Sequence, residues 1–251
     1  MATGPSANLP SQYGLETFRL DEIDSFIDPL GNEIFLGSSP TNQKITVEPI
    51  LAILGKVSCE KTLVLDNWVN YESRLFGTEP DSVLVFDSHA REYACRIFTQ
   101  DSTNVRQAKN YYIEESQQRF ILLKKEVKNI LFIEVPFNQF TTYSTLEGSS
   151  YCICRHLLKL CKDFPDHKII YRSHPSGDSP DCFTKFGLDF PGYASRVELS
   201  NNLEIIEDFA VSEFVVGLPS YALFLAQELG LRAYVVESTN GNWHGPKFNL
   251  L

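Results

Sequence analysis

The alternation of short apolar runs with helically spaced segments is the feature that most constrains the fold of this chain. It is regular between residues 129 and 238, where runs suited to strands lie at 129–135, 168–171, 194–197, 214–217 and 233–236. Helical spacing lies between them at residues 143–161, 203–208 and 221–229. Such alternation specifies a parallel sheet with helices on both faces and right-handed crossovers. The sequence therefore predicts a Rossmann-like α/β domain in the second half of the chain.

The first half shows a looser form of the same alternation. Apolar runs predict strands at residues 33–36, 62–65 and 82–86, and helical spacing predicts helices at 47–55, 89–98 and 110–125. Residues 1–14 are rich in Pro, Gly, Ser and Asn without periodicity, which is typical of a tail. The most polar break between the halves is KKEVKN at 124–129. We therefore expect a tail at 1–14, a Rossmann-like domain at 15–126 and a second one at 127–251.

The charge of the chain argues against two classes of partner. Its 32 Asp and Glu residues outnumber 22 Lys and Arg, for a formal net charge of −10, whereas proteins that bind duplex nucleic acid or membrane surfaces need a basic face. No stretch approaches the roughly 20 apolar residues of a membrane span, and the first dozen residues lack the features of a secretory signal. We expect a cytoplasmic protein in which local donors bind any anionic ligand.

The cysteines follow the apolar pattern and form no CxxC pair. Several lie in apolar periodic segments, where a thiol packs as a small hydrophobic group. We predict reduced core thiols, with a disulfide or metal site as the alternative, for Cys59, Cys95, Cys152, Cys154, Cys161 and Cys182.

The segment VSEFVVGLPSYALFLAQELG, residues 211–230, is the most informative one. An apolar strand ends at Gly217, Ser220 stands where a helix begins, and Gly230 stands where a helix C-cap belongs. In a parallel sheet this arrangement places Ser220 and the first-turn N–H groups at the carboxyl edge, where ligands bind. A helix N-terminus can bind an anion. The alternative is that Ser220 serves only as an N-cap.

The segment IIYRSHPSGDSP, residues 169–180, runs from a buried strand directly into polar residues. Arg172 and His174 fall at the same carboxyl edge, and Pro175 restricts His174 to an extended backbone. Arg172 is suited to bidentate phosphate binding, and His174 to donating a hydrogen bond or acting as a general acid. The alternative is that these are surface residues without a ligand.

A third group of polar residues follows the strands of the first half. Paired carboxylates near a histidine are suited to general acid–base catalysis, and the candidates are Asp66, Glu72 and Asp87, with Asn67, Asn70 and His89 nearby. The alternative is structural: Asp66 and Asp87 are helix N-caps, while Trp68 and Tyr71 pack in the core.

Other segments carry weaker signals. TLEGSSY at 145–151, which contains Glu147, has hydroxyl groups that could face a nucleotide, and NGNWHGPKF at 240–248 could form a lid or a tail. The chain has no GxxxxGK[ST], GxGxxG, GxSxG or HExxH motif, so P-loop hydrolysis, dinucleotide redox, serine hydrolysis and zincin chemistry lose their usual support.

The pairing of Arg172-Ser173-His174-Pro175 with the Ser-to-helix segment from Gly217 to Gly230 resembles the nucleotide-sugar half of bacterial GT-B glycosyltransferases. The sialyltransferase and capsule-polysaccharide branches, which use CMP-activated sugars, are the most similar. LDNWVNYESR, PDSVLVFD and NYY at 110–112 are similar to the end of the first domain in uncharacterised bacterial proteins of this architecture.

The resemblance implies two Rossmann-like domains, the first truncated by tens of residues. It implies that His174 and Ser220, with Tyr221, contact the phosphate of a sugar nucleotide, and that the base lies nearer residues 147–151, including Glu147. Arg172 and Pro175 belong to the same substrate-binding set. The chain departs from those branches in having Pro219-Ser220-Tyr221 where they carry a Ser-Ser or Ser-Thr pair, and in lacking a recognisable early acidic motif.

The leading hypothesis is a metal-independent, inverting glycosyltransferase-like enzyme of bacterial polysaccharide or natural-product glycosylation. It would bind a CMP- or UDP-sugar between its two halves and pass the sugar to a carbohydrate or other hydroxyl acceptor, using no cofactor. Asp66, Asp87 or Glu72 would deprotonate the acceptor, while His174 and the helix at Ser220 stabilise the departing phosphate.

Two alternatives stay open. A non-catalytic relative would use the scaffold to bind a peptide, protein or small ligand, since fold alone does not fix function. A sugar-nucleotide epimerase or hydrolase would need the base and the phosphate contacts but no acceptor site. Assembly into a homo-oligomer is also left open.

Overall fold

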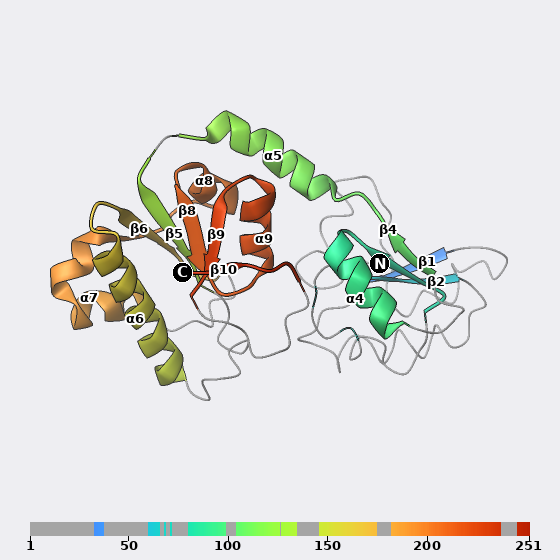
Figure 1. Ribbon diagram of the computed structural model, residues 1–251, viewed down its shortest axis with the longest axis horizontal. Helices are drawn as coiled ribbons and strands as arrows, with labels where there is room; N and C mark the ends of the chain where they lie inside the picture. Colours follow the sequence, from blue (N-terminus) through green and yellow to red (C-terminus); the bar gives the residue numbers. More distant parts are fainter. Residues whose placement is uncertain are drawn as a thin grey trace, which may run out of the picture. The chain divides into compact units, whose positions relative to one another are not determined.

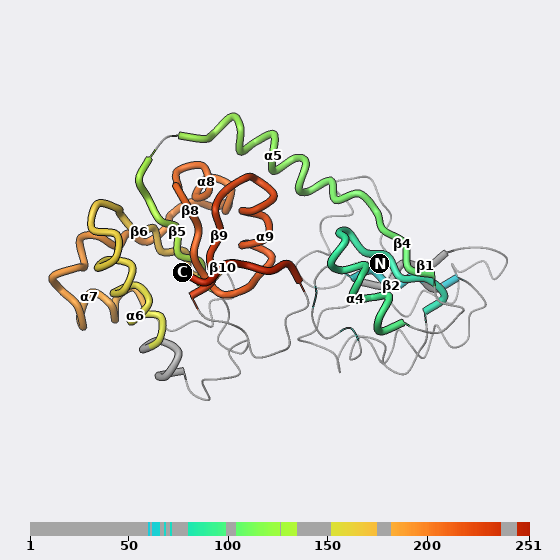
Figure 2. Tube along the Cα trace, viewed as in Figure 1, coloured from blue at the N-terminus to red at the C-terminus, as the bar shows by residue number. Residues whose placement is uncertain are grey.

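The computed structural model describes ten parts of the chain: residues 33–37, 60–65, 68, 71, 80–98, 104–125, 127–134, 146–174, 182–236 and 245–251 (Figure 1). Figure 2 follows most of these segments as a coloured trace. They divide into two compact units, one up to Lys109 and the other from Asn110 onward. The helix expected at residues 47–55 lies outside the described residues, as do Cys59, Asp66, Glu72 and Pro175.

The first unit contains a parallel sheet of four strands in the order β1-β2-β3-β4. Its strands are β1 (Glu33–Gly37), β2 (Glu60–Val64), β3 (Ser82–Val85) and β4 (Asn104–Gln107), and α4 (Ser88–Ile97) connects β3 to β4. The strands expected near residues 33–36, 62–65 and 82–86, and the helix near 89–98, are confirmed. Strand β4 was missed because its sequence, NVRQ, is polar and lies at the edge of the sheet.

The second unit contains a parallel sheet of six strands in the order β10-β9-β8-β5-β6-β7. The strands are β5 (Asn129–Ile133), β6 (Lys168–Arg172), β7 (Val197–Leu199), β8 (Phe214–Gly217), β9 (Arg232–Val235) and β10 (Asn249–Leu250). Numbered along this unit, the order is 6-5-4-1-2-3, which is that of a doubly wound Rossmann sheet. The expected parallel α/β fold is confirmed.

Helices cover both faces of the six-stranded sheet (Figure 1). On one face α6 (Leu146–Asp163) and α7 (Cys182–Asp189) pack over alternate residues of β5, β6 and β8, which include Phe132, Tyr171 and Val216. On the other face lie α5 (Tyr111–Leu123), α8 (Ile205–Ala210) and α9 (Tyr221–Glu228). The apolar alternation of the strands thus builds a core on each side of the sheet.

Two expected elements of the second unit differ from the structure. The strand expected at 194–197 was placed too early, because Pro191–Arg196 forms a 3-10 helix, η5, with Pro near its start, and β7 begins only at Val197. A segment ending at residue 248 was expected as a lid or tail. The two residues that follow it form β10, which pairs in parallel with β9.

The division between the units lies before α5, whereas the polar break at 124–129 placed it after this helix. Helix α5 contacts α8 and α9. The Gln117 side chain donates to the Glu228 carbonyl (3.0 Å), and the Lys125 amide donates to the Ala210 carbonyl (2.9 Å). These contacts make α5 part of the second unit.

The cysteines of the second unit are buried, as expected of core thiols. Cys152, Cys154, Cys161 and Cys182 are free and buried. The prediction of a core thiol is wrong for Cys95, which lies in the first unit and is exposed. Burial raises the pKa of the Cys154 thiol to about 11. These thiols pack as small hydrophobic groups.

Glycine is required at two points around α9. Gly217 pairs with Ile133 at the end of the central strands, and a Cβ there would lie 2.8 Å from the Ile133 carbonyl oxygen. Gly230 has a φ of +78°, which L-residues with side chains disfavour. The Gly230 and Leu231 amides donate to the carbonyls of Gln227 and Ala226, completing a Schellman motif. The predicted C-cap at Gly230 is confirmed.

We expect Gly217→Ala to lower the free energy of unfolding by about 1–3 kcal/mol, because the new methyl group would force β5 and β8 apart. A Cβ on Gly187, inside α7, meets nothing within 4 Å. Gly187→Ala should therefore be neutral or stabilise by up to about 1 kcal/mol. Thermal denaturation of both variants checks the contrast, and equal melting temperatures would contradict it.

The amino edge of the same sheet carries an ion-pair cluster. His167 Nε2 lies 2.9 Å from Glu213 Oε2, and Arg232 Nη2 lies 2.6 Å from Glu213 Oε1. The hydrogen bond from His167, and then the charges and the contact with Arg232, hold the pKa of Glu213 below its ordinary value of 4.5. The cluster joins the segment before β6 to the starts of β8 and β9.

Because the pKa of Glu213 is lower in the folded state, its contribution is full above pH 4.5 and is lost as the pH falls through the lowered value. Glu213→Gln should therefore be less stable than the wild type at neutral pH, with the difference shrinking in acid. Melting temperatures between pH 7 and about pH 3 measure this. Parallel pH profiles for the two proteins would contradict it.

Candidate functional site

The strand order of the second unit singles out one point on its carboxyl edge. β5 pairs with both β6 and β8, and the chain proceeds outward from β5 in opposite directions. The connection that follows β5 and the one that follows β8 therefore cross opposite faces of the sheet. In doubly wound sheets such a switch point is where ligands bind, outside the carboxyl ends of the strands. The residues that leave the sheet here follow β5, β6 and β8.

The turn from β8 into α9 places a helix N-terminus at this point. Ser220 has an extended backbone, and its hydroxyl accepts a hydrogen bond from the Leu223 amide (3.3 Å). The alternative role of Ser220 as an N-cap is thereby confirmed. Residues 218–221 are all partly exposed, so the hydroxyl and the first turn of α9 remain accessible to solvent.

His174 lies at the same edge, two residues after β6. Its backbone amide donates to Glu134 Oε2 (3.2 Å), and its side chain is partly exposed. Since β6 and β8 flank β5, His174 and Ser220 follow the two neighbours of the central strand. The structure therefore confirms that the two residues share one sheet edge.

Glu134, the residue that follows β5, was not among the predicted site residues. Its side chain is only 3% exposed, and the Cys182 thiol donates to Glu134 Oε1 (3.8 Å). Burial, and then the nearby Cys182 and Glu134, raise the pKa of the Tyr171 hydroxyl. Glu134 joins His174 to the first residue of α7. A carboxylate closing the apolar run NILFI was the signal that could have identified it.

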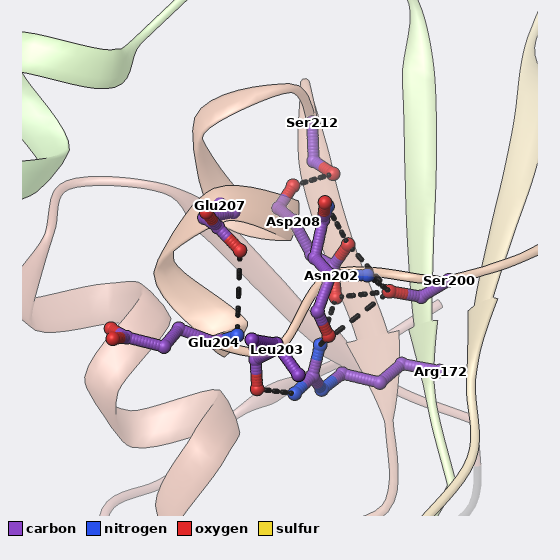
Figure 3. A network of polar contacts seen from close by, with 8 residues as sticks. All are labelled: Arg172, Ser200, Asn202, Leu203, Glu204, Glu207, Asp208 and Ser212. Atoms are coloured by element: carbon purple, nitrogen blue, oxygen red, sulfur yellow. Dashed lines mark hydrogen bonds and ion pairs between the residues drawn. The ribbon is translucent and has the colours of Figure 1, made fainter.

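Arg172 is engaged in a buried polar network, which Figure 3 shows. Its guanidinium contacts the fully buried Asp208 carboxylate (2.5 Å) and donates to the carbonyls of Asn202 and Leu203 (each 3.1 Å). Asp208 also accepts hydrogen bonds from the side chains of Ser200 (2.8 Å) and Asn202 (2.7 Å). These contacts join β6 to the β7–α8 connection and give Arg172 a structural role, so its predicted role with phosphate gains no support from them.

Asp87 belongs to the first unit and is the N-cap of α4. It accepts from the Ala90 amide (2.8 Å) and from the indole of the buried Trp68 (2.9 Å). Tyr71 is buried as well and stacks on Tyr93. The structural alternative for Asp87, Trp68 and Tyr71 is confirmed. Asp66 and Glu72 lie outside the described residues.

Of the remaining predicted residues, Tyr221 lies at the sheet edge, while the side chains of Glu147 and Pro175 are outside the described residues. Tyr221 is the first residue of α9, beside Ser220, and its hydroxyl accepts from Asn110 Nδ2 (3.1 Å). Glu147 lies in the first turn of α6, and its side chain, like Pro175, is outside the described set. The structure thus places His174, Ser220 and Tyr221 at one edge of the sheet, with Ser220 and Tyr221 adjacent in the chain.

We expect Asp208→Ala to lower the free energy of unfolding by about 3–5 kcal/mol, because it leaves Arg172 partly buried without its carboxylate. Lys168 and Glu198 form an exposed pair between β6 and β7. Lys168→Ala is the matched control and should cost less than about 1 kcal/mol. Chemical denaturation measures the free energy of unfolding of both variants. If Asp208→Ala lowers it by less than about 1 kcal/mol, the structural role of the Arg172 network is contradicted.

Comparisons of the sequence find little. No family model matches it, and no curated protein matches it either. Among the described residues, no helix is long and apolar enough to cross a membrane.

Comparisons of the structure do find relatives. A putative UDP-N-acetylglucosamine 2-epimerase from Listeria monocytogenes superposes with a TM-score of 0.54 at 13% identity, over 83% of this chain and 58% of that protein. S. aureus MnaA in complex with UDP superposes with a TM-score of 0.54 at 14% identity, over 94% of this chain and 70% of that one. The chain thus spans less than two thirds of the Listeria protein. At such identities the likeness shows the fold alone: the chain is an α/β protein with Rossmann-like parallel sheets, matching structures of the GT-B type.

Proposed function

We propose that the second unit binds a sugar nucleotide of the UDP- or CMP-sugar class, with its phosphate at the β8–α9 turn. The strand order carries this proposal, because it puts the end of β5 at the switch point where doubly wound sheets bind ligands. The S. aureus protein of similar fold was solved with UDP. This likeness favours UDP over CMP.

The phosphate contacts follow from the donors at this edge. The first-turn N–H groups of α9 and its dipole favour an anion even in a chain of net charge −10. The Ser220 hydroxyl is accessible beside them, and the His174 side chain is partly exposed across β5.

The reaction we propose is transfer of the sugar to an acceptor hydroxyl, with His174 and α9 stabilising the departing phosphate. The general base is a carboxylate, for which the sequence offers Asp66, Glu72 and Asp87 as candidates. The step needs the base to take the acceptor proton as the new glycosidic bond forms and the bond to the nucleotide phosphate breaks.

Two other outcomes each have one supporting observation. The Listeria protein of similar fold is a putative UDP-sugar epimerase, which favours chemistry on the sugar nucleotide without an acceptor. The structural contacts of Asp87 favour a non-catalytic binding protein. Incubation with UDP-N-acetylglucosamine separates these outcomes. An epimerised sugar nucleotide or a released sugar indicates chemistry without an acceptor. A sugar nucleotide that stays intact, both alone and with a set of acceptors, indicates a non-catalytic binding protein.

Calorimetric titration with UDP, CMP and their sugars tests the proposal. We expect His174→Ala to weaken binding by about 1–3 kcal/mol with little change in melting temperature. Ser220→Asp keeps an N-cap but places a carboxylate against the ligand phosphate, so it should abolish binding without unfolding α9. Ser173→Ala, at an exposed neighbouring residue, is the control. No binding of any of these ligands to the wild type would refute the proposal.

A further inference from the structure

The motif Asn110-Tyr111-Tyr112 begins the second unit and has no part in the function proposed so far. Asn110 is the N-cap of α5: its Oδ1 accepts from the Ile113 amide (3.3 Å). The Nδ2 of the same side chain donates to the Tyr221 hydroxyl (3.1 Å). The Asn110 side-chain amide therefore caps the start of α5 and also holds the Tyr221 side chain beside it.

Tyr221 and Tyr112 stand next to one another, and we refer to them as the tyrosine pair. Their ring centroids are 6.4 Å apart with an angle of 36° between the planes. The Tyr221 ring also packs on Phe224, with centroids 5.8 Å apart. The hydrogen bond and the two ring contacts hold Tyr221 in one orientation.

Tyr112 remains 51% exposed although it leans on Tyr221. A tyrosine side chain has few rotatable bonds, so it loses little conformational entropy when a second ring stacks on it. Nucleobases stack on such side chains without needing hydrogen bonds. The tyrosine pair is thus suited to a planar ring ligand.

The place of the pair connects it with the phosphate site. Tyr221 is the first residue of α9 and directly follows Ser220. The Tyr221 ring therefore belongs to the same first turn of α9 at which the phosphate is proposed to bind. The pair lies within the second unit, so this argument uses one compact body alone.

We infer that Tyr112 and Tyr221 form the nucleobase subsite of this chain, with a uracil or cytosine ring stacked on Tyr112. The inference rests on the proposed nucleotide binding. It places the base away from residues 147–151, where the family resemblance puts it, and gives Tyr221 a role with the base in addition to the phosphate. Asn110 is then a positioning residue that acts through Tyr221.

Titration with UDP and with inorganic pyrophosphate separates base from phosphate binding. Stacking on an aromatic side chain contributes about 1–3 kcal/mol, and 1.4 kcal/mol is tenfold, so Tyr112→Ala should weaken UDP binding by about 5-fold to about 100-fold. Its affinity for pyrophosphate should equal that of the wild type. Tyr112→Phe keeps the ring and should keep the affinity for UDP. Tyr111→Ala, at a neighbouring tyrosine that is 73% exposed, is the matched control.

The outcomes distinguish this inference from the function on which it rests. Unchanged UDP binding by Tyr112→Ala, together with loss of binding by His174→Ala, would overturn the base subsite and leave the phosphate site standing. An equal loss for UDP and pyrophosphate, or a loss for Tyr111→Ala as large as for Tyr112→Ala, would also overturn it. A wild type that binds neither ligand would refute the proposed function and the subsite together.

Discussion

The pairing of β5 with β8 at the centre of the six-stranded sheet is the interaction on which the second unit depends. Along the chain these two strands are separated by β6, β7 and their helices, yet Ile133 and Gly217 are direct partners at their ends. The pairing divides the sheet into two halves whose helices cover opposite faces. It also fixes where the crevice of a doubly wound sheet must open, since the connections diverge only there.

Polar contacts around two buried carboxylates, Asp208 and Glu134, stabilise one side of the sheet's carboxyl edge. Asp208 satisfies its buried charge through Arg172, Ser200 and Asn202, which fixes the β7–α8 connection against the end of β6. Glu134 accepts from the His174 amide and the Cys182 thiol and so holds the segment that follows β6. Removing one member of such a set leaves its partners buried and unsatisfied. The side chains left accessible between these anchors include His174 and Ser220.

Apolar periodicity was enough to predict the central strands and most helices, because β5 and β8 are buried on both faces and read as unbroken apolar runs. Edge elements carry no such signal. β4 is polar, β10 has only two residues, and the Pro191 turn displaces the start of β7. The sequence was enough to predict that His174 and Ser220 lie at one edge of the sheet, because each follows a strand and parallel strands have their carboxyl ends on the same side. It could not show that Arg172 pairs with Asp208, 36 residues later and on another element. Glu134 was overlooked because the expected strand was drawn through it to residue 135, whereas β5 ends at Ile133.

Hydrogen–deuterium exchange of the intact chain with and without saturating UDP tests the central claim most directly, since it shows where on the backbone a nucleotide acts. The account predicts slower exchange of amides at the β8–α9 turn, residues 218–223, and at residues 110–113, with no change at the amino edge around Glu213. Binding of UDP that protects only the first unit, or only the amino edge, would contradict it.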